Sequence, residues 1–150
     1  MNKVFSILFF ILIISIGLFQ YIRNSEQSIN YERFNLVSPG ILRTPDERFE
    51  DLKDYPFTPN YLTIGDTRIH YIDEGPKDGQ IIYLLHGEPT WSYLFRKMIP
   101  TLVNEGFRVI APDMVGFGKS DKYISTDDYS HQIHVDKMTQ LIVELDLKNI

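Results

Sequence analysis

The residues best suited to chemistry form the run His-Gly-Glu-Pro-Thr-Trp at positions 86–91, directly after the apolar run 81–85. In open α/β sheets, ligands bind at the carboxyl ends of the strands, so this position favours a functional loop. Gly87 allows the backbone to approach a ligand closely, and Pro89 fixes the turn while removing one donor. The neighbouring N–H groups can then point into a crevice and stabilise an anion. The same spacing also fits an ordinary strand-to-helix turn with a buried His86, and spacing alone does not separate the two.

A second polar segment, residues 113–121, follows the apolar run 107–111 and contains two glycines and a Lys-Ser pair. A phosphate-binding loop of the form GxxxxGK[ST] needs glycine at position 113, where Asp113 stands. The dinucleotide-binding pattern GxGxxG fails as well, because Asp121 occupies its last glycine position. We therefore interpret the segment as a glycine-containing turn in which Asp113 bonds backbone groups.

Several kinds of site are excluded by composition. The 150-residue chain has no cysteine, so it has no disulfide, no thiol nucleophile and no cysteine-bound metal. His131 and His134 stand three apart at the start of an expected helix, but no third ligand is near, so we expect no metal site. His70 alternates within an expected edge strand. The net charge of −5, with no basic stripe, argues against a nucleic-acid partner.

The order of expected elements predicts an α/β protein. Two β-rich runs joined by a Gly-Asp-Thr turn predict an antiparallel edge hairpin, and two unbroken apolar runs predict buried parallel strands. A helix closed by Gly106 is expected between the buried strands, and a polar loop is expected before a second helix. In chain order these are the hairpin 61–64 and 68–72, strand 81–85, helix 93–105, strand 107–111, loop 119–128 and helix 131–147.

The second helix is predicted from a stripe of apolar residues at helical spacing. By contrast, residues 39–60, which we call the prelude, are rich in proline and charge, which predicts irregular structure with at most a short helix. The members of the stripe are Val135, Met138, Leu141, Ile142 and Leu145.

The composition of the N-terminal segment predicts that it contacts a membrane. Residues 4–22 are almost entirely apolar behind the single charge of Lys3, and about 20 apolar residues suffice to cross a bilayer. This length favours an uncleaved anchor in residues 1–22, whereas Ser15 and Gly17 also permit a signal peptide cleaved after Gly17. A buried core helix is the third alternative. Residues 23–38 are expected to form a tether, and the charge of Lys3 favours a domain on the outer, periplasmic or extracellular side.

Four stretches of the chain resemble haloalkane dehalogenases of the α/β-hydrolase fold. A His-Gly-x-Pro turn alone is shared with epoxide hydrolases and many other α/β hydrolases, but the full HGEPTW run and the matching prelude are more specific. The resemblance covers residues 39–150 and implies the N-terminal half of an α/β-hydrolase fold. The four stretches are residues 42–49, 55–61, 86–98 and 111–122.

The resemblance implies hydrolysis of alkyl halides to alcohols, with a small halogenated alkane as substrate and no cofactor. An Asp nucleophile displaces the halide, and a His-activated water hydrolyses the resulting alkyl-enzyme ester. By the same resemblance, the backbone N–H of Glu88 supplies half of the oxyanion hole, and its side chain lies near the halide pocket. His86, Gly87 and Pro89 shape this loop, Glu88–Pro89 is a candidate cis bond, and Trp91 is expected to form part of the pocket wall.

The nucleophile itself has no candidate among residues 1–150. The fold places it in a G-x-nucleophile-x-G elbow after a strand, and no such elbow occurs in the sequence. We therefore expect an incomplete α/β-hydrolase domain in residues 39–150 that is inactive and poorly soluble by itself. Two alternatives stay open: an epoxide hydrolase or other α/β hydrolase, and a non-catalytic membrane-tethered relic or interaction protein.

Overall fold

The computed structural model describes residues 12–21 and 35–150. The chain divides into two compact units, Met1–Leu36 and Val37–Ile150. In the first unit, residues 12–21 form a helix whose apolar side chains are exposed. No helix within the described residues is both long and apolar enough to cross a bilayer. The apolar segment 4–22 extends past this helix at both ends, beyond the described residues, so its anchor or signal role stays a prediction.

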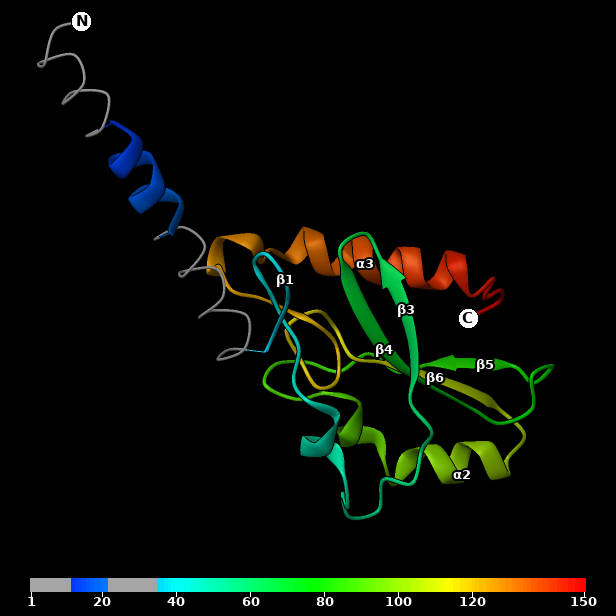
Figure 1. Cartoon of the computed structure of the whole chain (residues 1–150). Coiled ribbons are helices and arrows are strands. Elements are labelled where there is room, and N and C mark those ends of the chain that lie inside the picture. Colours follow the sequence, from blue (N-terminus) through cyan, green and yellow to red (C-terminus); the bar gives the residue numbers. More distant parts are fainter. Residues whose placement is uncertain (1–11, 22–34) are drawn as a thin grey trace, which may run out of the picture. The chain divides into compact units, whose positions relative to one another are not determined.

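The Val37–Ile150 unit is built on a four-stranded mixed sheet with the strand order β3-β4-β6-β5 (Figure 1). β3 (Asn60–Ile64) pairs antiparallel with β4 (Thr67–Glu74), and β4 pairs antiparallel with β6 (Arg108–Pro112). β6 pairs in parallel with β5 (Ile81–Tyr83). The predicted hairpin, the parallel pair and the α/β class are therefore confirmed.

Two helices cover opposite faces of this sheet (Figure 1): α2 (Met98–Asn104) and α3 (His131–Glu144). Ile72 of β4 belongs to the buried cluster that includes residues of α2. Ile69, three residues earlier on the same strand, packs in a second cluster with Leu141 of α3. Side chains an odd number of residues apart on a strand point to opposite faces, so β4 contributes to both cores.

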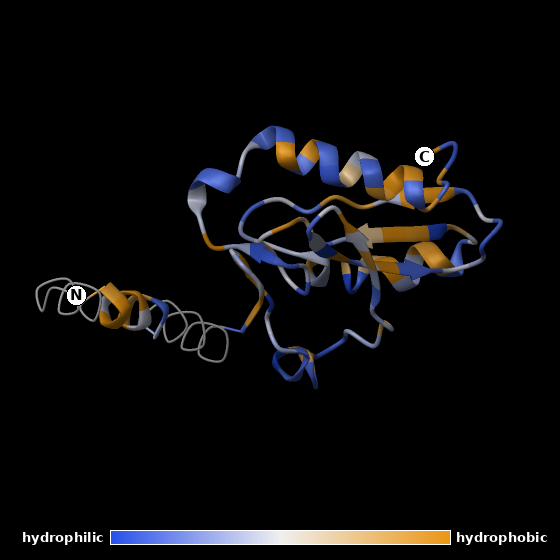
Figure 2. Cartoon of the chain, turned by 45° about the horizontal axis from the view of Figure 1, so that its top comes forward, coloured by the Kyte–Doolittle hydropathy of each residue, from blue (hydrophilic) through white to orange (hydrophobic). Residues whose placement is uncertain are grey.

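The helix α3 begins at His131, as predicted, and ends at Glu144, three residues short of the predicted end. Ser130 caps it by accepting a hydrogen bond from the backbone N–H of Ile133. Within the predicted stripe, Met138 and Leu141 are buried, whereas Val135 is 42% exposed. The reason is that the first turns of α3 extend past the main sheet (Figure 1). Figure 2 shows hydrophobic and hydrophilic residues alternating along this long helix.

The predicted buried strand 81–85 is shorter and less covered than expected. β5 ends at Tyr83, although the N–H of Leu84 still donates to the carbonyl of Ile110 (2.8 Å). Leu85 is 53% exposed. Within the described residues β5 lies at the edge of the sheet, so it pairs on one side only and its side chains are only partly buried.

The predicted helix 93–105 is interrupted. A short 3₁₀ helix spans Ser92–Phe95, and α2 starts only at Met98. This break places Pro100 in the first turn of α2, where a missing N–H costs no intrahelical hydrogen bond. Gly106 ends the helix with a φ of 89°, and the N–H of Phe107 donates to the carbonyl of Leu102, which confirms the predicted glycine cap.

A second, three-stranded sheet joins parts of the chain that were expected to be irregular. The last residues of the predicted tether form β1 (Leu36–Ser38), beside β2 (Ile41–Leu42). β2 pairs antiparallel with β7 (Lys122–Tyr123), which lies inside the predicted polar loop 119–128. Sequence patterns miss strands of two residues because so short a run shows no alternation.

Two further 3₁₀ turns complete the described elements, Asp46–Phe49 and Thr126–Asp128. The first agrees with the expectation of at most a short helix in residues 39–60.

The hairpin β3–β4 is fixed to α3 by a buried lysine. Ile64 pairs with Thr67, so Gly65 and Asp66 form the turn between the strands. The ammonium group of Lys137 donates to the carbonyl of Ile64 (2.6 Å) and to the carboxylate of Asp66 (3.1 Å). A buried ammonium group is stable only when it is paired in this way, so this contact locks the turn against the helix.

Replacing Lys137 with Met should loosen the hairpin. The change keeps most of the apolar stem but removes the shorter of the two side-chain hydrogen bonds to the carbonyl of Ile64, leaving only that from the Thr67 hydroxyl (3.3 Å), and it removes the ion pair with Asp66, at a cost of about 1–3 kcal/mol. We expect backbone amides of β3 and β4 to exchange with deuterium about 5- to 100-fold faster. Lys148→Met is the matched control, because the Lys148 side chain is 72% exposed. Equal rates of amide exchange in the two variants would contradict the role of Lys137 in holding the hairpin.

Candidate active site

The loop at positions 86–91 leaves β5 and lies beside the segment that follows β6. His86 is buried, and its Nε2 accepts a hydrogen bond from the backbone N–H of Met114 (3.0 Å). Its Nδ1 lies 3.2 Å from the carbonyl oxygen of Gly87. Since a backbone N–H can only donate, Nε2 is unprotonated, and Nδ1 carries the proton. His86 is therefore a buried histidine that fixes the start of the loop, in agreement with the simpler of the two sequence interpretations.

The middle of the loop is open. The Glu88–Pro89 peptide bond is cis, as the resemblance implied. The turn is closed by Thr90, whose backbone N–H (2.9 Å) and hydroxyl (2.6 Å) both donate to the carbonyl of Gly87. A Cβ atom added at Gly87 would meet no atom within 4 Å, so no part of the described chain requires glycine there. Within residues 35–150, the exposed Glu88 donates its backbone N–H to no protein group.

Trp91 ends the loop inside an aromatic cluster. Its ring stacks on Tyr93 at a centroid distance of 5.5 Å and contacts Phe49 (5.4 Å) and Tyr55 (5.3 Å). Phe49 and Tyr55 come from the prelude, so this irregular segment supports the loop from outside the sheet. The expected place of Trp91 in a pocket wall stays a prediction.

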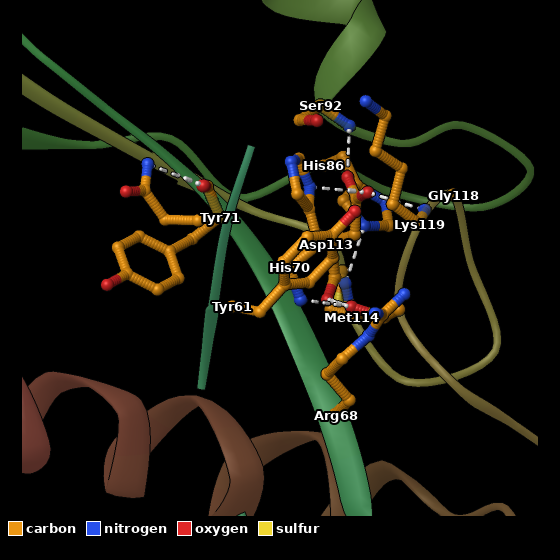
Figure 3. Close-up of polar contacts among 12 residues, drawn as sticks. Tyr61, Arg68, His70, Tyr71, His86, Ser92, Asp113, Met114, Gly118 and Lys119 are labelled. Atoms are coloured by element: carbon orange, nitrogen blue, oxygen red, sulfur yellow. Dashed lines mark hydrogen bonds and ion pairs between the residues drawn. The ribbon is translucent and has the colours of Figure 1, made fainter. Parts of the chain in front are cut away.

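Asp113 is the centre of the polar network beneath the loop (Figure 3). The residue is fully buried, and its Oδ1 accepts the backbone N–H of Ser92 (2.8 Å). Its Oδ2 accepts the backbone N–H of Lys119 (2.9 Å) and lies 2.9 Å from Nδ1 of His70. The predicted glycine turn with Asp113 bonding backbone groups is confirmed.

The side-chain partner of Asp113 is His70, and the prediction that His70 lies on an edge strand is wrong. The sequence placed His70 on an edge strand, but β4 lies inside the sheet, and His70 is buried. Tyr71 pairs with Pro112, and the N–H of Asp113 donates to the carbonyl of His70, so the strand register sets the two residues opposite each other. A signal was present in the sequence, because an aspartate directly after a buried strand needs a partner.

The charge of Asp113 depends on these contacts. Burial alone would raise its pKa, but the hydrogen bond and charge of His70 and the N–H groups of Ser92 and Lys119 outweigh that cost. The pKa of Asp113 is therefore lower than the ordinary carboxyl value. Burial lowers the pKa of the Lys119 ammonium group, which lies over the rings of Phe49 and Tyr55.

The turn 113–121 is held at its far end by a second buried carboxylate. Asp121 accepts two hydrogen bonds from the guanidinium of Arg43 (2.7 and 2.9 Å) and one from the N–H of Arg68 (2.8 Å). Between the two carboxylates, Ser120 donates its hydroxyl to the carbonyl of Asp113 (2.6 Å) and accepts the N–H of His70 (2.9 Å). The turn is thus tied to both β4 and the prelude.

The remaining histidines, His131 and His134, lie in the first turn of α3. No group of three His, Cys, Asp or Glu residues suited to a metal occurs in the part of the chain that the structure describes. Burial, with the nearby His86 and His131, lowers the pKa of His134.

Comparison with known proteins places this architecture in a class. A sequence model of the α/β-hydrolase fold matches residues 80–150. A solved haloalkane dehalogenase, DpaA from Paraglaciecola agarilytica NO2, described as tetrameric, superposes with a TM-score of 0.70 at 52% identity over 73% of this chain and 38% of its own. A putative epoxide hydrolase from Klebsiella pneumoniae reaches a TM-score of 0.54 at 28% identity, over 64% of this chain and 33% of its own. The chain therefore has the α/β-hydrolase fold.

Sequence relatives identify the family within the α/β-hydrolase fold. Haloalkane dehalogenases from Psychrobacter cryohalolentis and Mycolicibacterium paratuberculosis are each 56% identical to this chain over 115 residues, which is 73% of the chain and 38% of each relative. The chain is a homologue of haloalkane dehalogenases over that stretch. It spans less than two fifths of the length of these relatives.

Replacing Gly118 with Ala should displace the loop. An added Cβ would lie 2.6 Å from Cγ of Asp113 and 2.8 Å from Cε3 of Trp91, closer than real Cβ atoms come. We expect a shift in the emission of Trp91, the only tryptophan in the chain. Gly40→Ala is the matched control, because Gly40 also has a positive φ but open space around it. An unchanged emission in Gly118→Ala would contradict this packing.

Proposed function

We propose that this chain supplies the oxyanion loop of a haloalkane dehalogenase. In the proposed reaction, an aspartate oxygen attacks the halogen-bearing carbon, the carbon–halogen bond breaks, and halide leaves. Water, losing a proton to a histidine, then attacks the carbonyl carbon of the alkyl-enzyme ester. The tetrahedral intermediate collapses, its remaining hydroxyl proton passes to the departing alkoxide to give the alcohol, the carboxylate is regenerated, and the histidine releases its proton to solvent. Homologues at 56% identity are haloalkane dehalogenases, which supports this reaction over epoxide hydrolysis.

The observation that carries the proposal is the backbone N–H of Glu88, beyond the carboxyl end of β5, which donates to no protein group within residues 35–150. Hydrolysis of the ester develops a negative charge on the carbonyl oxygen, and a preorganised N–H donor stabilises that charge in the transition state. The loop is held at the start by His86, while Gly87, Glu88 and Pro89 are exposed. The proposed role of the Glu88 side chain is to lie at the halide side of the pocket.

The nucleophile, the second carboxylate and the catalytic histidine are proposed to lie in the part of the dehalogenase fold that residues 1–150 do not match. The sequence has no G-x-nucleophile-x-G elbow, and the relatives contain much more chain than the 115 matched residues. The 150-residue chain by itself is therefore expected to release no halide.

A hybrid enzyme tests the function directly. Residues 39–150 replace the matched segment of a 56% identical relative, and halide release from short chloro- and bromoalkanes is measured. We expect turnover within about tenfold of the intact relative, because the loop sequence is compatible with its chemistry, and no release from the 150-residue chain. Turnover of epoxides without halide release by a folded hybrid would overturn the proposal.

We also propose that residues 1–22 attach the protein to a membrane, with the domain on the outer side. The support is the apolar run of residues 4–22 behind Lys3. The chain should sediment with membranes and resist extraction by alkaline carbonate, whereas a variant starting at Pro39 should be absent from that fraction. Complete extraction of the full chain by carbonate would contradict an anchor.

A further inference from the structure

The two ends of the oxyanion loop are both held by adjacent residues of another segment. At the start, Nε2 of His86 accepts the N–H of Met114 (3.0 Å). At the end, the N–H of Ser92 donates to Oδ1 of Asp113 (2.8 Å). Glu88 lies between these two fixed points. The position of its N–H therefore depends on the segment that begins at Asp113.

The carboxylate of Asp113 has little freedom to move. His70 and the N–H of Lys119 hold Oδ2, each at 2.9 Å, and the N–H of Asp113 itself is bonded to the carbonyl of His70. Gly118 packs directly against the carboxylate and against Trp91. Oδ1 is thus presented to Ser92 at a position set by β4 and by the glycine turn.

Ser92 receives a second constraint from the prelude. Its hydroxyl lies 2.8 Å from the hydroxyl of Tyr55, and both Ser92 and Tyr55 are buried. Side-chain and backbone contacts of Ser92 therefore join the prelude, the loop and the turn after β6. Only the contact with Asp113 carries a charge, and hydrogen bonds to charged groups are about twice as strong as neutral ones.

We propose that Asp113 is a positioning residue for the oxyanion loop, which it holds through the N–H of Ser92 and aligns for catalysis. The catalytic part of this inference rests on the proposed function. Loss of the Asp113 charge releases the Ser92 end of the loop and displaces the N–H of Glu88. This donor acts on the transition state of ester hydrolysis, which follows halide loss, so its displacement lowers kcat more than kcat/KM.

The first test measures the loop in the full 150-residue chain. Trp91 is the only tryptophan, so labelling with 5-fluorotryptophan gives one ¹⁹F NMR resonance beside Ser92. Asp113→Asn should shift or broaden this resonance. Asp121→Asn is the matched control, because Asp121 is also buried and accepts three hydrogen bonds but makes none to the loop. An unshifted resonance in Asp113→Asn, or an equal shift in both variants, would overturn the inference.

The second test measures catalysis in the hybrid enzyme. We expect Asp113→Asn to lower kcat for halide release by about 10- to 100-fold, the scale of a misplaced catalytic group, with kcat/KM within about threefold because ester hydrolysis follows halide loss. Asp121→Asn should keep kcat within about threefold. If the unmodified hybrid releases no halide, the proposed function fails while the ¹⁹F test still decides the positioning role. If the unmodified hybrid is active and its Asp113→Asn variant has the same kcat, the positioning role is contradicted and the proposed function is not.

A pair of variants at His70 covers the case in which Asp113→Asn does not fold. Asn at position 70 can place its amide N–H where Nδ1 of His70 donates to Asp113, whereas Leu cannot donate. His70→Leu should shift the Trp91 resonance and lower kcat. His70→Asn should keep the resonance position and kcat close to those of the unsubstituted protein. Equal effects of the two variants would show that packing at His70, and not its hydrogen bond, matters to the loop.

Discussion

Both oxygens of a buried carboxylate need hydrogen-bond donors, and this requirement at Asp113 organises the centre of the domain. Transfer of an unpaired charge into a protein interior costs far more than the stability of a small domain, so the surrounding groups must donate. The donors come from three places in the chain: the side chain of His70 on β4, the backbone of Lys119 in the turn after β6, and the backbone of Ser92 after the loop. These three segments are thereby held in one arrangement.

The sheet brings the loop and the turn together. β5 and β6 are parallel neighbours, so the segments that follow them emerge at the same edge. His86 follows one strand and Met114 the other, and their hydrogen bond spans 28 positions of sequence. The prelude adds an aromatic wall through Phe49 and Tyr55 against Trp91. His86 is buried at the start of the loop, whereas Gly87, Glu88 and Pro89 are exposed. A rigid support beneath an open turn is the arrangement that a preorganised donor needs.

Local patterns predicted the elements whose signals are local. The Gly-Asp-Thr run predicted the hairpin, the glycine at position 106 predicted the end of α2, and the apolar stripe predicted α3. Patterns failed where neighbours far along the chain decide the outcome. β7 exists only because β2 pairs with it, and β5 is short because it is paired on one side. Val135 follows the helical period but is 42% exposed.

The sequence by itself determined the α/β class, the HGEPTW loop and the resemblance to haloalkane dehalogenases, because these depend on residue types at fixed short spacings. It also indicated that Asp113 bonds backbone groups of a glycine turn. Only the tertiary structure decided which groups those are and that His70, 43 positions away, is the side-chain partner. The physical reason is strand register: β4 and β6 set His70 opposite Asp113, and register is a property of the assembled sheet.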